Sequence, residues 1–163
     1  MLAALARADV RLYRAVRSAA RPPASTAVSR FSTLGEHAGL WIGIGTAGVL
    51  LDERRRERWQ RAVTVVAGTY VLNTVIKAAV RRPRPAFDGL PALVRTPSAL
   101  SFPSAHASTS FAAARVYGEL LPAAPLYATA VAMACSRVYL GVHYPSDVAT
   151  GILLGLAIGS ATR

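Results

Sequence analysis

The sequence predicts an all-α protein: a polytopic membrane bundle of five transmembrane helices, preceded by an amphipathic helix at the membrane surface. Two features of composition predict this, since 53% of the 163 residues are hydrophobic and yet the formal net charge is +11. The third is the order of the charges. Residues 40–51, 62–76 and 148–162 carry none, whereas residues 52–61 carry five arginines. Basic blocks between apolar stretches are typical of polytopic membrane proteins, and the length fits a single domain over residues 1–163.

The same composition argues against several other classes of protein. Disordered chains are poor in apolar residues, and a single cysteine, Cys135, excludes a disulfide framework and a cysteine-based structural zinc site. A nucleic-acid binder would interleave arginines with aromatic residues, which are only 7% here, so we expect no nucleic-acid partner. A soluble protein with buried helices stays an alternative, because the uncharged runs fall short of the roughly 20 residues that cross a bilayer.

Residues 2–20 are predicted to form the amphipathic helix, which ends at Pro22, Pro23 and Ser25. One stripe of the helix is basic and consists of Arg7, Arg11, Arg14 and Arg21. The opposite side is mostly apolar and consists of Leu2, Leu5, Leu12, Tyr13 and Val16. Residues 1–30 lack the apolar central region of a secretory signal peptide, so they fit an interfacial segment in the lipid headgroup layer. Their arginine-rich composition leaves an organellar transit peptide as an alternative.

Five spans are expected to follow, at residues 34–52, 59–80, 105–121, 123–142 and 146–162. Pro122 and Pro125 are expected to make the turn between the third and the fourth. Each span reaches its length only by including polar residues, which are Glu36, His37, Lys77, Arg115, Glu119 and Arg137. Polar side chains inside a membrane bundle usually face its interior and serve function. Close helix packing is expected at Gly43, Gly45, Gly48, Gly151, Gly155 and Gly159, of which the last three share one helix face.

The first of three polar clusters stands at the end of the second span. Pro83 and Pro85 cannot continue a helix, which leaves four cations at one membrane surface: Lys77, Arg81, Arg82 and Arg84. A basic cap that holds lipid headgroups and a part of a binding site are both compatible with this cluster.

The second cluster opens the third span. Ser104 is a good N-cap residue, and the N–H groups that follow it at the helix start can bind an anion. His106 would lie in the first turn of that helix, either as part of this site or as an incidental histidine.

The third cluster joins the fourth and fifth spans. Arg137 lies in an otherwise apolar helix and therefore needs an anionic partner. His143 precedes Pro145, which suits a helix start. Asp147 then falls in the first turn, where its carboxylate can fix the tautomer of the His143 ring and raise its basicity.

Together the clusters provide cations, a helix N-terminus and two histidines, as a phosphate site requires. The order Lys-x6-Arg-Pro, Pro-Ser-x-His and Ser-Arg-x5-His-x3-Asp resembles the type 2 phosphatidic acid phosphatase superfamily, which includes membrane lipid phosphatases, soluble acid phosphatases and vanadium haloperoxidases. The matching residues, all within 77–147, are Lys77, Arg84, Pro85, Pro103, Ser104, His106, Ser136, Arg137, His143 and Asp147. The sequence departs from the family at Ala105, which usually is Gly. The first motif also follows the second span rather than the third, so the chain resembles a shortened, five-span member.

The resemblance implies a role for each matching residue. His143 would attack phosphorus and form a phosphohistidine, and Asp147 would orient it. His106 would protonate the leaving oxygen and then activate water. The phosphoryl oxygens would be held by Lys77, Arg84, Ser104 and Arg137, with the N–H groups of Ala105 and His106. The resemblance implies no metal and no cofactor.

The implied activity is hydrolysis of a membrane lipid phosphate in the inner membrane of a bacterium. Expected substrates are polyprenyl phosphates or diphosphates, phospholipid phosphates, and polyprenyl-phosphoryl sugar phosphates. Because the Ala and Arg usage suggests a GC-rich actinomycete genome, decaprenylphosphoryl-5-phosphoribose is the leading expectation. A vanadate-dependent oxidase and a non-enzymatic membrane scaffold are the alternatives. The sequence does not indicate an oligomeric state.

The side of the membrane follows from the arginines outside the motifs. With five spans, residues 1–30 and all three motifs share one side. Six arginines in residues 1–30 compare with five in residues 52–61 plus Arg163, which is nearly a tie under the positive-inside rule. Because the first basic segment often dominates, we expect a cytoplasmic N-terminus and an active site that faces the cytoplasm.

Overall fold

The computed structural model describes residues 2–20 and 24–162, with side chains from residue 6 onward, and the elements of these residues are all helices. The helices are α1 (Leu2–Ser18), α2 (Ala24–Thr33), η1 (Glu36–Ala38), α3 (Gly39–Leu51), η2 (Glu53–Arg55), α4 (Arg56–Val80), α5 (Ala105–Tyr117), α6 (Ala123–Tyr139) and α7 (Pro145–Ala161). The described residues contain one isolated bridge, between Pro83 and Leu100, and no strand. The predicted all-α class is confirmed.

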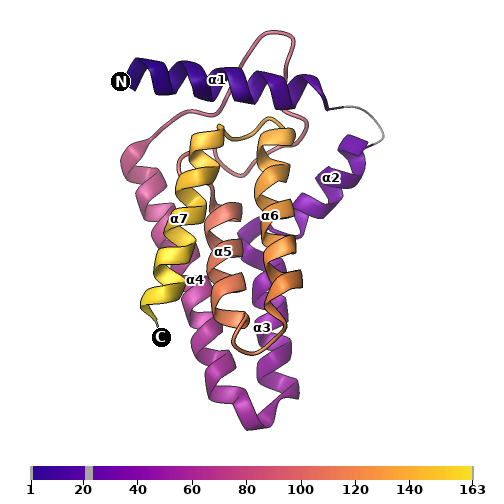
Figure 1. Cartoon of the computed structure of the whole chain (residues 1–163), viewed down its shortest axis with the longest axis vertical. Helices are drawn as coiled ribbons and strands as arrows, with labels where there is room; N and C mark the ends of the chain where they lie inside the picture. The colour runs from indigo at the N-terminus through magenta and orange to yellow at the C-terminus, as the bar shows by residue number, and fades with distance from the viewer. Residues whose placement is uncertain (1, 21–23, 163) are drawn as a thin grey trace.

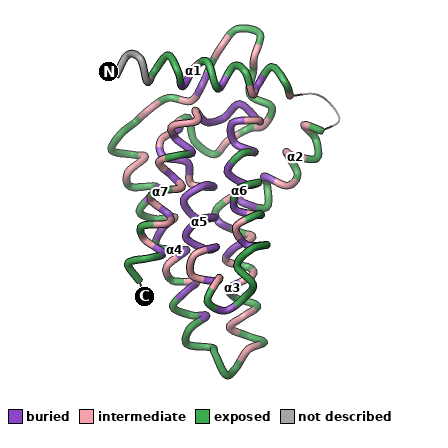
Figure 2. The backbone as a smooth tube through the Cα atoms, viewed as in Figure 1, coloured by how far each residue is buried: buried purple, intermediate pink, exposed green. Residues whose placement is uncertain are grey.

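Helix α5 forms the centre of the bundle, with α4, α6 and α7 around it (Figures 1 and 2). Its side chains from His106 to Ala114 are buried, and most of them are small, so neighbouring backbones can approach closely. As predicted, one face of α7 provides that approach. A Cβ atom at Gly151 would lie 2.7 Å from the Ser104 carbonyl oxygen, and one at Gly155 would overlap the Ser108 carbonyl oxygen.

The ends of the helices follow local sequence signals. Helix α4 ends at Val80, where Arg81 adopts a left-handed φ of 55° two residues before Pro83. Ser104 is the N-cap of α5 and accepts a hydrogen bond from the Ala107 N–H. Helix α7 begins at Pro145, as expected for a proline in a first turn.

Each of the five expected spans coincides with a helix, but their lengths are unequal. Only Glu53–Val80, with 28 residues, is by itself long and apolar enough to cross a membrane among the residues described. Helix α2 and the segment Glu36–Leu51 pass the same test only as a pair bent by 50°. Helix α7 is apolar but shorter. The helical bundle is therefore established, whereas the crossing of the membrane by five helices stays a proposal.

Three details of the sequence prediction are wrong. No helix was expected between residue 20 and the first span at residue 34, yet helix α2 forms there and packs against α6 through the buried Ser32. Gly43 does not mediate packing, since a Cβ atom there would meet nothing within 4 Å. Pro125 lies inside the first turn of α6, where the missing N–H costs little, and not in the turn before it. The expected positions of Arg21, Pro22 and Pro23 lie outside the described residues.

Helix α1 crosses the end of the bundle at which the segment 81–104 and the turn between α6 and α7 lie (Figure 1). It is the helix predicted over residues 2–20, but the expected apolar face is wrong in part. Tyr13 is buried as expected, but Leu12 is 53% exposed, and Asp9 and Arg17 are buried beside Tyr13. Tyr13 donates a hydrogen bond to the Gly141 carbonyl, and Arg17 donates one to the Pro91 carbonyl. The helix therefore binds the loops beneath it through polar groups at four-residue spacing.

We predict that Gly155→Ala destabilises the protein, because the added methyl group meets backbone atoms of α5 that cannot move aside. Overpacking of this kind costs about 1–3 kcal/mol. Thermal melting in detergent should show a lower Tm. Gly68→Ala on α4 is the matched control, since a Cβ atom there meets nothing within 4 Å. Equal melting of Gly155→Ala and the wild type would contradict the close α5–α7 contact.

Candidate active site

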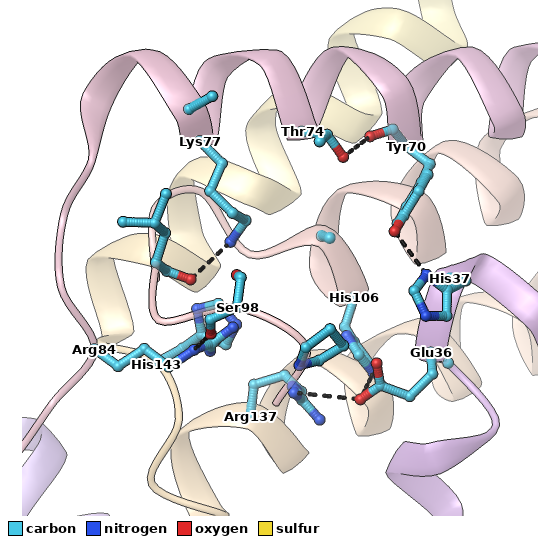
Figure 3. A pocket seen from close by; sticks show the side chains of 15 residues that line it. Glu36, His37, Tyr70, Thr74, Lys77, Arg84, Ser98, His106, Arg137 and His143 are labelled. Carbon is cyan, nitrogen blue, oxygen red and sulfur yellow. Dashed lines mark hydrogen bonds and ion pairs between the residues drawn. The ribbon is translucent and has the colours of Figure 1, made fainter. Parts of the chain in front are cut away.

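A cavity of about 230 Å³ lies between α4, α5, α6 and η1, near the end of the bundle that α1 covers. Figure 3 shows Lys77 on the α4 wall, with His106, Arg137, Arg84 and His143 across from it. Six predicted site residues line the cavity: Lys77, Arg84, Ala105, His106, Arg137 and His143. The structure thus brings together residues from all three sequence clusters.

The cations of the cavity are held mainly by backbone carbonyl groups. Lys77 Nζ donates to the Leu100 carbonyl at 3.1 Å. Arg84 donates to the carbonyls of Ser98 and Val142, at 2.8 Å and 2.7 Å. Carbonyl oxygens satisfy these donors without bringing a full negative charge, so the cavity keeps its positive potential. Such a cavity favours an anion of more than one charge.

Arg137 was predicted to need an anionic partner, and in the structure the carboxylate near it is that of Glu36. Arg137 is 2% exposed, and its Nη2 lies 3.9 Å from Glu36 Oε1. Its Nη1 donates to the Ser32 hydroxyl, while its Nε has no hydrogen-bond partner among the described residues. The guanidinium is therefore only partly compensated, and it faces the cavity.

His143 is buried on the short segment between α6 and α7. Arg84 Nη1 lies 3.1 Å from His143 Nε2 and donates to it, so Nε2 acts as the acceptor and Nδ1 carries the proton. Burial lowers the pKa of His143 well below its usual value, and the positive charges of Arg84, Arg137 and Lys77 lower it further. The ring is therefore neutral at pH 7, and its Nε2 lone pair points toward the cations that would hold a phosphate.

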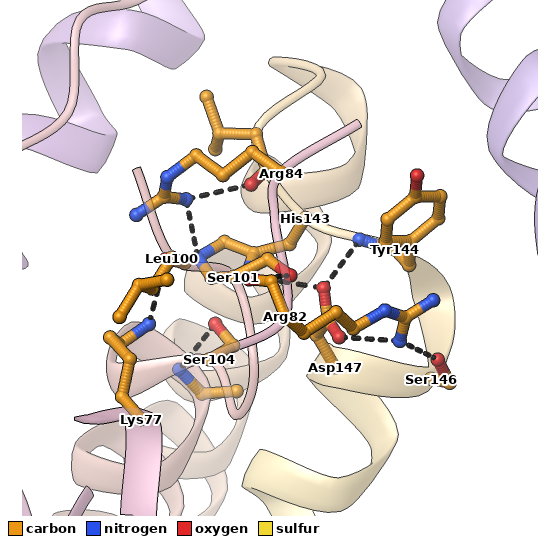
Figure 4. A network of polar contacts seen from close by, with 12 residues as sticks. Lys77, Arg82, Arg84, Leu100, Ser101, Ser104, His143, Tyr144, Ser146 and Asp147 are labelled. Atoms are coloured by element: carbon orange, nitrogen blue, oxygen red, sulfur yellow. Dashed lines mark hydrogen bonds and ion pairs between the residues drawn. The ribbon is translucent and has the colours of Figure 1, made fainter. Parts of the chain in front are cut away.

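Asp147 lies behind His143 and does not line the cavity. Its Oδ2 is 3.6 Å from His143 Nδ1 and accepts a hydrogen bond from the Tyr144 N–H at 2.9 Å. Its Oδ1 accepts from Arg82 Nη1 at 2.7 Å (Figure 4). The predicted approach of the carboxylate to the ring is thus present, at a distance slightly longer than a hydrogen bond.

His106 lies in the first turn of α5, as predicted, and its Nε2 donates to the Ser32 carbonyl at 3.1 Å. The same nitrogen is 3.8 Å from Glu36 Oε1. His106 and His143 are therefore each close to one carboxylate, Glu36 and Asp147 respectively.

Ser104 was expected to contact phosphate, but it does not line the cavity. It is fully buried, and its hydroxyl accepts the Ala107 N–H as the cap of α5. Its neighbour Ala105 does line the cavity, at the N-terminus of the helix.

Four polar residues around the site have partners there that the sequence analysis did not predict: Asp9, Ser32, Glu36 and Arg82. Asp9 is the only acidic residue before Glu36, and its place in an arginine-rich segment could have indicated a specific partner. Glu36 and Arg137 could have been paired, since each was an unusual charge within an expected span. Ser32 gave no signal, because its part in the site depends on the unexpected helix α2.

Among the described residues no group of three or more His, Cys, Asp or Glu side chains is arranged to hold a metal ion.

Comparison with known proteins agrees with this geometry. The model of the PAP2 superfamily matches residues 58–163. The chain is 40% identical over 157 residues to decaprenylphosphoryl-5-phosphoribose phosphatase of Mycobacterium tuberculosis, covering 94% of this chain and 88% of that protein.

Two solved structures have a similar fold. Aquifex aeolicus LpxE has a TM-score of 0.79 at 25% identity, over 94% of this chain and 93% of LpxE. The PAP2-type phosphatidylglycerolphosphate phosphatase of Bacillus subtilis has a TM-score of 0.77 at 27% identity, over 98% of this chain and 84% of that one. The chain therefore belongs to the PAP2 superfamily and, like these relatives, is a phosphatase.

Proposed function

We propose that this protein is an integral membrane lipid phosphatase that binds the phosphate group of its substrate at the depth of the lipid headgroups. The observation that carries the proposal is the cavity itself, in which Lys77, Arg84 and Arg137 surround two histidines at one end of an apolar bundle. Phosphoryl transfer depends mainly on positioning and on charge stabilisation, and this set of side chains supplies both.

We propose that α3 to α7 all cross the inner membrane of a bacterium, with α1 in the interface above the site. Large apolar side chains such as Leu51, Val71, Val75 and Leu153 are exposed on the outside of the bundle, where lipid would cover them. Helix α5 has 13 residues, about 20 Å at 1.5 Å per residue, which is short for a bilayer. Its burial supports the proposal, because the surrounding helices would shield it from lipid.

We propose a polyprenyl-phosphoryl sugar phosphate as the substrate, with decaprenylphosphoryl-5-phosphoribose as the first candidate. The support is the mycobacterial relative, a decaprenylphosphoryl-5-phosphoribose phosphatase, to which this chain is 40% identical over 94% of its length. Beyond the phosphate site the cavity continues along α4 past Thr74 and Tyr70. Tyr70 and His37 form a hydrogen-bonded pair there, 2.7 Å apart. These polar groups would suit the hydroxyl groups of a sugar.

In the first step of the proposed mechanism, His143 Nε2 attacks phosphorus, a P–N bond forms, and the P–O bond to the leaving group breaks. Arg84, Arg137 and Lys77 would bind the phosphoryl oxygens and neutralise their charge. His106 would give a proton to the leaving oxygen, and the carboxylate of Glu36 would stabilise the protonated ring before that transfer.

In the second step a water molecule attacks the phosphohistidine. His106 would take a proton from the water, the new P–O bond would form, and the P–N bond would break to restore neutral His143. Asp147 would stabilise the positive charge that His143 carries while it is phosphorylated. Atoms and protons balance over the two steps, and the products are inorganic phosphate and the dephosphorylated lipid.

We predict that the detergent-purified protein releases phosphate from a polyprenyl-phosphoryl sugar phosphate faster than from phosphatidic acid or phosphatidylglycerophosphate. His143→Ala should lower the rate at least about 10³-fold, since loss of a covalent nucleophile removes the main reaction path. Phosphate release and halide oxidation with vanadate should be measured side by side. A His143→Ala variant that keeps a tenth of the wild-type rate, or halide oxidation without phosphate release, would contradict the proposal.

We predict that His106→Ala slows the first step, formation of the phosphohistidine, about 10²- to 10⁴-fold more for alkyl phosphates than for aryl phosphates. An aryl leaving group departs without a proton, so it needs no general acid in the first step. Burst amplitudes and rates for one aryl and one alkyl phosphate would measure this difference. Equal slowing of the first step for both substrates would show that His106 is not the acid.

We propose that the active site faces the cytoplasm. Single cysteines at Ser25→Cys and Gln60→Cys, each in a Cys135→Ser background, would test this in intact cells with an impermeant thiol reagent. The proposal predicts labelling at position 60 and not at position 25. The reverse pattern would place the site on the outer face of the membrane.

A further inference from the structure

A chain of ion pairs connects helix α1 to the candidate nucleophile. Asp9 Oδ2 on α1 lies 2.8 Å from Arg82 Nη2, and Arg82 Nη1 lies 2.7 Å from Asp147 Oδ1. Asp147 in turn approaches His143 at 3.6 Å. Neither Asp9 nor Arg82 lines the cavity, so both act on the site only through Asp147.

Arg82 is held in one orientation by contacts on several sides. One nitrogen, Nη1, donates to both Asp147 and the Ser146 hydroxyl, at 2.7 Å and 2.8 Å (Figure 4). The other terminal nitrogen donates to Asp9. The guanidinium also stacks over the Tyr144 ring, 4.1 Å from its centroid. A planar fork bound to two carboxylates fixes the position of both.

Asp9 also binds the start of the helix that carries Asp147. Its Oδ1 accepts the Ser146 N–H at 2.9 Å, and its Oδ2 accepts the Ser146 hydroxyl at 2.6 Å. A carboxylate at a helix N-terminus binds otherwise unpaired N–H groups and favours the helix dipole. Asp9 therefore stabilises the first turn of α7, in which Asp147 lies one residue after Ser146.

Attachment of α1 does not by itself require an aspartate at this position. Tyr13 and Arg17 already hold α1 through the carbonyls of Gly141 and Pro91. Asp9 is 9% exposed and is the only acidic residue within α1. Its contacts converge on Arg82 and Ser146, the two neighbours of the catalytic carboxylate, and not on the loop that the rest of α1 covers.

We propose that Asp9 and Arg82 are positioning residues for His143, so that the interfacial helix is a part of the active site. Through Arg82, Asp9 sets the orientation and the effective charge of Asp147. This inference rests on the proposed function, in which His143 attacks phosphorus.

The charges define how this network acts on His143. Two carboxylates and one guanidinium give the network a net charge of −1. The other charged or titratable groups near His143 come from α4, the loop after it, α5, α6 and the start of α7, and are Lys77, Arg84, His106, Arg137 and Tyr144. A negative charge stabilises the protonated ring, so loss of Asp9 should make His143 harder to protonate, and loss of Arg82 should make it easier.

The test compares Asp9→Asn and Arg82→Gln with the wild type in detergent, with one lipid phosphate. Both variants should lower kcat about 10- to 100-fold, as is typical for residues that orient a reacting group, while KM changes less than threefold. In the pH profile of kcat/KM, the acidic limb reports protonation of His143. It should move to lower pH in Asp9→Asn and to higher pH in Arg82→Gln. Ionisation of the substrate is common to all variants and cancels in the comparison.

Two conservative variants and two control variants separate positioning from stability. Asp9→Glu keeps the charge and should recover most of kcat. Arg82→Lys keeps the charge but loses the planar guanidinium, so it should lower kcat without moving the acidic limb of the pH profile. The same variant tests the inference if Asp9→Asn fails to fold. Asp88→Asn and Arg54→Gln change the same charges at exposed positions and should match the wild type.

Several outcomes would overturn the inference. The first is a kcat within twofold of the wild type in both Asp9→Asn and Arg82→Gln. The second is a shift of the acidic limb of kcat/KM in the same direction in both variants, and the third is an effect confined to KM. If the wild type and His143→Ala are equally inactive on lipid phosphates, the proposed function fails. If the wild type is active, His143→Ala is inactive and Asp9→Asn is normal, only the present inference fails.

Discussion

The structure depends on holding several cations close together at one end of an apolar bundle. A buried charge is costly unless it is paired and hydrogen-bonded. Here Lys77 and Arg84 are bound by neutral carbonyls, and Arg137 by a hydroxyl and the more distant Glu36. The compensation is incomplete, which leaves the cavity with the potential to bind a phosphate. These partners come from the loops, from helix α2 and from η1.

Close packing in the bundle brings the cations together. Helix α5 has a core of small residues, and the glycines of α7 let the two backbones touch. That contact fixes the turn before α7, on which His143 lies, relative to His106 in the first turn of α5. Helix α1 then covers the loops and binds the same turn through Asp9. The position of His143 therefore depends both on the packing of α5 against α7 and on the polar contacts of α1 with the turn before α7.

Local signals allowed much of the fold and site to be predicted, and distant contacts account for the rest. Pro83, Ser104 and Pro145 marked helix ends correctly, because their effects are confined to a few residues. His106, Arg137 and His143 were placed together by motif spacing and do line one cavity. The Asp9–Arg82 pair joins residues 73 positions apart, and helical periodicity does not indicate which polar groups will be buried against a loop. Ser104 was assigned to phosphate because its sequence position fits both a cap and a ligand.

The central claim is that His143 carries the phosphoryl group between two steps. The most direct test is to mix the protein with a ³²P-labelled aryl phosphate, quench within milliseconds in alkaline detergent, which preserves phosphohistidine, and map the label by peptide. The account predicts label on the peptide that contains His143, with more label in His106→Ala because hydrolysis of the intermediate needs that base. Turnover with no labelled intermediate, or with label on another residue, would contradict it.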